Sequence, residues 1–93
     1  KTFIEANTND AYTFKVSTNN NIRFYINNEK LIDSFETGKF SSYQTLPINL
    51  SISKPYSLFI VLYINENVNF NLEWKNTSTI LTFQNISNLN LFY

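Results

Sequence analysis

Apolar and polar side chains alternate along most of this chain with the two-residue period of a β-strand that buries one face. The alternation is clearest in Tyr12–Ser17, Ile22–Ile26 and Val68–Lys75, where every second position is aromatic or aliphatic. No stretch shows the 3.6-residue period of an amphipathic helix. The pattern therefore predicts a chain built from short strands.

Turns rich in asparagine separate these strands. Asn27-Asn28 lies between two apolar runs, and because Asn tolerates positive φ, the pair predicts a two-residue hairpin with a primed turn. Further strands are expected at 1–5 (or a frayed end), 30–35, 43–53, 56–65, 80–84 and 85–93. Strand 30–35 has a weak period, because Leu31 and Ile32 are adjacent. About seven short strands with turns between them predict an all-β fold, an antiparallel β-sandwich or barrel.

Two of these strands have special features. In 43–53, four apolar residues share one face, and Pro47 cannot donate a backbone hydrogen bond, so the strand is expected at a sheet edge. Those apolar residues are Leu46, Ile48, Leu50 and Ile52. Strand 56–65 is apolar on both faces, which indicates either a central strand covered on both sides or a face that meets another part of a longer parent chain.

Composition narrows the classes of function. The chain has 93 residues, which predicts one domain over 1–93, and it carries seven basic and seven acidic residues. The basic residues are scattered, so a nucleic-acid partner is not expected. There is no His or Cys, no pair of carboxylates stands out, and no apolar run is long enough to span a membrane. The sequence therefore predicts a protein that is not an enzyme. The start at Lys1 and the absence of Met suggest a fragment of a longer chain.

Several segments, in order, resemble the PA14 domain family. Tyr12–Asp33 resembles the family's core motif of an aromatic strand, a polar turn, a v-r-l-y-i-d-g strand and a k-l-i-d continuation. Tyr56–Ile60 is similar to its Y-p-i-r-i strand, and Leu72–Trp74 to its L-x-W ending. The tail Ile80–Leu91 resembles the strand that closes the domain in bacterial binary toxins. The resemblance covers the chain from about Ile4 onward, and the family's first strand is missing.

This resemblance implies a secreted, extracellular, bacterial module. The first expected function is a non-catalytic cap or accessory domain of a virulence toxin, with the rest of the toxin chain or a partner toxin component as its partner. The alternative is a carbohydrate-binding module for cell-surface glycans. Sugar-binding members hold calcium through a tandem Asp pair, whereas this chain has Asn19–Asn21 there, so calcium is disfavoured and no cofactor is expected. Trp74 is either a sugar platform or, as its inward position favours, a core aromatic residue.

Five residues are the candidates for contact with a ligand or partner. Tyr25 and Tyr63 face outward on the strand alternation. Phe59 and Val61 occupy positions where the PA14 family usually carries charges, which suggests an inter-domain face. Asp33 matches an acidic position of the family motif, where a turn-capping role is expected rather than catalysis. No catalytic residue and no metal ligand is predicted.

Overall fold

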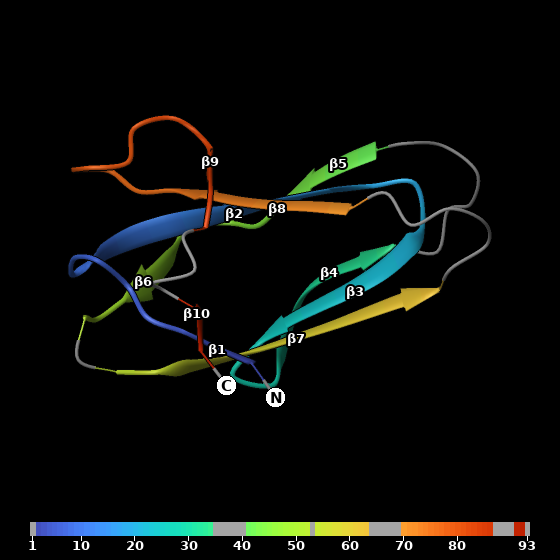
Figure 1. Cartoon of the computed structure of the whole chain (residues 1–93), viewed down its shortest axis with the longest axis horizontal. Helices are drawn as coiled ribbons and strands as arrows, with labels where there is room; N and C mark the ends of the chain where they lie inside the picture. Colours follow the sequence, from blue (N-terminus) through green and yellow to red (C-terminus); the bar gives the residue numbers. More distant parts are fainter. Residues whose placement is uncertain (1, 35–40, 53, 64–69, 87–90, 93) are drawn as a thin grey trace.

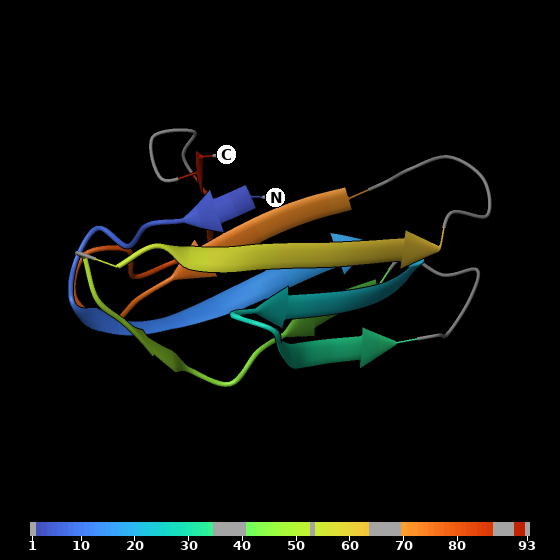
Figure 2. The same ribbon diagram turned by 90° about the horizontal axis from the view of Figure 1, so that it is seen from below.

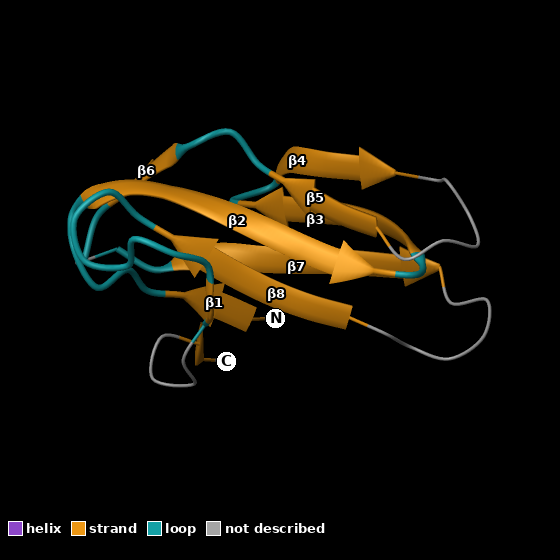
Figure 3. Cartoon of the chain, turned by 90° about the horizontal axis from the view of Figure 1, so that it is seen from above, coloured by secondary structure: helices purple, strands orange, loops and turns teal. Residues whose placement is uncertain are grey.

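The computed structural model describes residues 2–34, 41–52, 54–63, 70–86 and 91–92, and these residues form two layers of antiparallel strands (Figure 1). Each sheet has five strands, and the first sheet has the order β10-β1-β7-β3-β4 (Figure 2). Its strands are β1 (Thr2–Ile4), β3 (Asn21–Ile26), β4 (Glu29–Ser34), β7 (Tyr56–Tyr63) and β10 (Leu91–Phe92). The second sheet has the order β5-β2-β8-β9, and β6 also pairs with β2 (Figure 3). Its strands are β2 (Asp10–Thr18), β5 (Ser41–Gln44), β6 (Ile48–Leu50), β8 (Phe70–Lys75) and β9 (Gln84–Asn85). The predicted all-β antiparallel sandwich is confirmed.

The core lies between the two sheets and is built from the alternating apolar positions of β2 and β3. Phe14 of β2 and Phe24 of β3 are fully buried, with ring centroids 5.8 Å apart across the layers. Trp74 of β8 is 2% exposed and packs on Tyr12 and Phe14, with centroids at 4.8 and 6.0 Å. Trp74 is therefore a core residue, which excludes it as a sugar platform.

The hairpin between β3 and β4 forms at the predicted asparagine pair. Asn27 and Asn28 have φ angles of 49° and 66°, the left-handed conformation that a primed two-residue turn requires. Asn27 also fastens the turn to β7, because its Oδ1 accepts a hydrogen bond from the Ser57 amide at 2.8 Å and its own amide donates to the Ser57 carbonyl at 2.9 Å. The turn thus fixes the register of three strands.

A β-bulge explains the weak period of β4. Phe24 pairs with Ile32, but the next residue, Tyr25, pairs with Lys30, so Leu31 is an extra residue on β4. Ile32 is buried, and Leu31 packs against the core while remaining partly exposed. The two adjacent apolar residues both find apolar surroundings because the bulge interrupts the alternation.

The single strand expected over 43–53 is wrong: β5 and β6 are separate, and the chain leaves the ladder between them. Leu46 is 84% exposed and Ile52 45% exposed, so neither shares the buried face with Leu50. Thr45 bridges the gap, since the Phe14 amide donates to Thr45 Oγ1 at 3.0 Å and the Thr45 amide donates to the Phe14 carbonyl at 2.9 Å. The break falls at Pro47, which lacks a donor. Both strands do lie at an edge, as the proline predicted.

The strand expected over 80–84 is also wrong, because only Gln84 of that range lies in a strand. Residues 76–80 form a tight loop instead, held by the side chain of Asn76. Its Oδ1 accepts hydrogen bonds from the amides of Ser78, Thr79 and Ile80 at 3.2, 2.8 and 2.6 Å. This loop places Ile80 in the core at 9% exposure. Of the closing alternation at 85–93, residues 87–90 and 93 lie outside the described residues, and the described part contributes Asn85 to β9 and all of β10.

Candidate functional site

Four of the five predicted contact residues lie on one surface, the outer face of the first sheet (β10-β1-β7-β3-β4). Because Phe24 points into the core, its neighbours Arg23 and Tyr25 point outward. Tyr25 is directly opposite Phe59, and Arg23 is opposite Val61 on β7 and Asp33 on β4. We call these five residues, Arg23, Tyr25, Asp33, Phe59 and Val61, the outer patch. The fifth prediction, Tyr63, pairs with Asn21 through its backbone, and its side chain lies outside the described part of the chain.

The centre of the outer patch is an aromatic pair. The rings of Tyr25 and Phe59 are 5.7 Å apart at an angle of 45°, a tilted arrangement that favours ring-edge contact. Phe59 is 55% exposed although it stands on the middle strand of its sheet. Strand β7 is therefore central within the sheet, but the described residues cover only its inner face.

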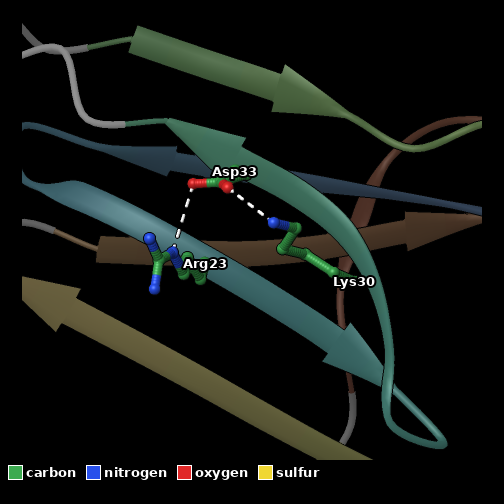
Figure 4. A network of polar contacts seen from close by, with 3 residues as sticks. All are labelled: Arg23, Lys30 and Asp33. Atoms are coloured by element: carbon green, nitrogen blue, oxygen red, sulfur yellow. Dashed lines mark hydrogen bonds and ion pairs between the residues drawn. The ribbon is translucent and has the colours of Figure 1, made fainter.

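An ion network borders the aromatic pair on the β4 side (Figure 4). Lys30 Nζ lies 2.8 Å from Asp33 Oδ2, and Arg23 Nε lies 3.3 Å from Asp33 Oδ1. The hydrogen bond from Lys30, followed by that from Arg23, lowers the pKa of Asp33 below its usual value of 3.8. The β4 bulge makes this network possible, because residues three apart in a regular strand would point to opposite faces.

Sequence reasoning missed Arg23 and Lys30 as members of this surface. Arg23 was visible as an outward residue beside Tyr25. Lys30 could have been found from the adjacent Leu31 and Ile32, because two neighbouring inward-packing residues signal a bulge that changes which residues share a face.

The arrangement is suited to binding rather than to proton transfer. Asp33 is ionised and held by two cations, so it has no free proton near neutral pH to give to a substrate. Its side chain bonds to Lys30 on the same strand and to Arg23 on β3. Its expected turn-capping role stays a prediction, because residues 35–40 lie outside the described part of the chain. Exposed aromatic rings beside an arginine and other charges are typical of protein–protein contact surfaces.

A second polar cluster surrounds Asp10 at the start of β2. Its carboxylate accepts hydrogen bonds from Ser78 Oγ at 2.5 Å, from Thr77 Oγ1, from the Thr77 amide at 3.3 Å and from the Ala11 amide at 2.8 Å. These donors, Ser78 and Thr77 foremost, lower the pKa of Asp10 to about 2. The cluster joins β2 to the connection between β8 and β9, so its role is structural.

The outer face of the second sheet carries cations that cover an aromatic ring. The Nζ atoms of Lys15 and Lys75 lie 5.2 and 4.8 Å from the centre of the Phe83 ring. Both contacts are within the range of a cation–π interaction. Phe83 is thereby held beside Lys15 of β2 and Lys75 of β8.

The described residues contain no group of three or more Asp, Glu, His or Cys side chains that could hold a metal. At the turn compared with a calcium site, the Asn20 amide group donates to Asn19 Oδ1 at 3.1 Å, and Asn21 Oδ1 is buried without a partner. The expectations of no cofactor, of no enzymatic activity and of secretion stay predictions. In the part of the chain that is described, no helix is long and apolar enough to cross a membrane.

Comparison with known proteins finds likeness at the level of fold. No protein-family model and no curated sequence matches the chain. A solved structure described as an anti-sigma factor domain-containing protein superposes with a TM-score of 0.86 at 22% identity, over 98% of this chain and 31% of the other. A second, from Clostridium clariflavum and of the same description, gives a TM-score of 0.83 at 22% identity, over 97% of this chain and 30% of the other. The chain thus spans just under a third of these proteins.

These comparisons correct the identification made from the sequence. No PA14 model matches, and both structural neighbours carry another description, so the PA14 assignment is wrong, as are the toxin cap, the toxin partners and the carbohydrate-binding alternative. The physical reason lies in the motifs themselves. Each was a few residues of aromatic and aliphatic alternation, a pattern that many antiparallel sandwiches share.

Proposed function

We propose that this sandwich is a non-catalytic regulatory module, which acts by protein contact within a longer chain that carries an anti-sigma factor domain. The fold likeness over 98% of the chain to a protein of that description carries the proposal. Since the sandwich fold accounts for 31% of that neighbour, a module of this type occupies a part of such a chain and leaves room for the anti-sigma domain elsewhere.

The chemistry of the described residues supports a binding role. The chain has no His and no Cys, and the two carboxylates with shifted pKa values, Asp10 and Asp33, are both shifted downward and held by donors. Such groups are poor general acids or bases at neutral pH. The outer patch, in contrast, exposes an aromatic pair beside charged groups, a combination that suits contact with another protein surface.

The test uses cells that express the whole gene product together with a reporter for sigma-dependent transcription. Phe59→Asp places a charge in the centre of the outer patch, and we expect it to change reporter output several-fold, in line with a lost hot-spot contact. Leu81→Asp is the matched control, because Leu81 is 69% exposed in the loop before β9. Equal output from the Phe59→Asp variant and the unmodified protein, with both folded by circular dichroism, would refute the proposal.

A further inference from the structure

We draw no further inference here: the strongest candidate, the hollow beside the outer patch that Thr2 of β1 and Leu58, Phe59 and Ile60 of β7 line, carries no assignment because nothing in the structure shows what covers it.

Discussion

Asparagine occupies a turn position with positive φ in this chain that glycine occupies in many other proteins, and Asn28 is the simplest example. Asn28 has a φ of 66° and is exposed, whereas the side chain of its neighbour Asn27 also bonds to Ser57. Asn28→Ala therefore isolates the conformational cost. We expect it to lower the free energy of unfolding in urea by roughly 1 kcal/mol, because Cβ without a compensating side chain disfavours the left-handed region.

Asn28→Gly is the matched control, since glycine adopts positive φ without steric cost, and its unfolding midpoint should equal or exceed that of the unmodified chain. Equal losses in the Ala and Gly variants would show that the asparagine side chain, and not its backbone, supports the turn.

Asp10 gives the chain a predictable response to acid. Its pKa is about 2 in the folded protein, against 3.8 for an aspartate side chain free in water, so folding favours the ionised carboxylate. The stability that this preference contributes is complete above the unfolded pKa and is lost as the pH falls from 3.8 towards 2. Asp10→Asn should lower the urea midpoint at neutral pH and flatten its fall across that acidic window.

Asp33 also has a lowered pKa, so part of the acid sensitivity should persist in Asp10→Asn and should decrease further when Asp33→Asn is added. The measurement is a set of urea midpoints from neutral pH to the acidic window. If Asp10→Asn falls as steeply as the unmodified chain, the hydrogen bonds from Thr77 and Ser78 do not stabilise the carboxylate in solution.

At the scale of elements, the strands followed from alternation, and the irregular connections did not. The core strands β2, β3 and β8 were predictable because each has one buried face. The turn at Asn27-Asn28 was predictable because asparagine tolerates the positive φ that a two-residue hairpin requires. The break at Pro47, the bulge at Leu31 and the loop wound by Asn76 depend on hydrogen bonds to distant strands or neighbouring amides, which alternation does not encode.

The candidate site divides in the same way. Tyr25, Phe59 and Val61 were predictable as outward positions, but their gathering on one face required the register of β3 against β7. The ion network required the bulge as well. A family assignment could not be obtained from such patterns, because short alternating motifs reflect sheet physics that unrelated sandwiches share.

The bridge between β5 and β6 is the connection whose energetic role is easiest to test. Thr45 is buried and its Oγ1 is the acceptor for the Phe14 amide. Thr45→Val keeps the shape but leaves that buried N–H without a partner, so we expect a loss of about 1–3 kcal/mol in the free energy of unfolding. Thr13→Val on the outer face of β2 is the control and should change stability little. Equal effects of the two substitutions would mean that β5 and β6 do not need the bridge.

At the scale of the whole molecule, the two sheets are joined by a hydrogen bond between edge strands and by the core between their inner faces. On one side, Ser34 Oγ donates to Tyr43 OH at 2.9 Å and so links the edge strands β4 and β5. On the opposite side, the short strand β1 pairs with Tyr56–Leu58 of β7, and β9 pairs with Glu73 and Trp74 of β8. The cohesion of the two sheets depends on the shared core, which includes Phe14, Phe24 and Trp74.

This shared core predicts that the sheets unfold together. Trp74 is the sole tryptophan and lies between the layers, so its fluorescence reports the core, while far-UV circular dichroism reports both sheets. We expect the two signals to give the same urea midpoint, as in a two-state domain. Phe14→Leu should lower both midpoints equally, by an amount that reflects about 1–3 kcal/mol of lost packing, and Leu81→Ala at an exposed position should leave both unchanged. Separate midpoints in the unmodified chain would show that each sheet is stable without the other, which is incompatible with a single core that holds the two sheets together.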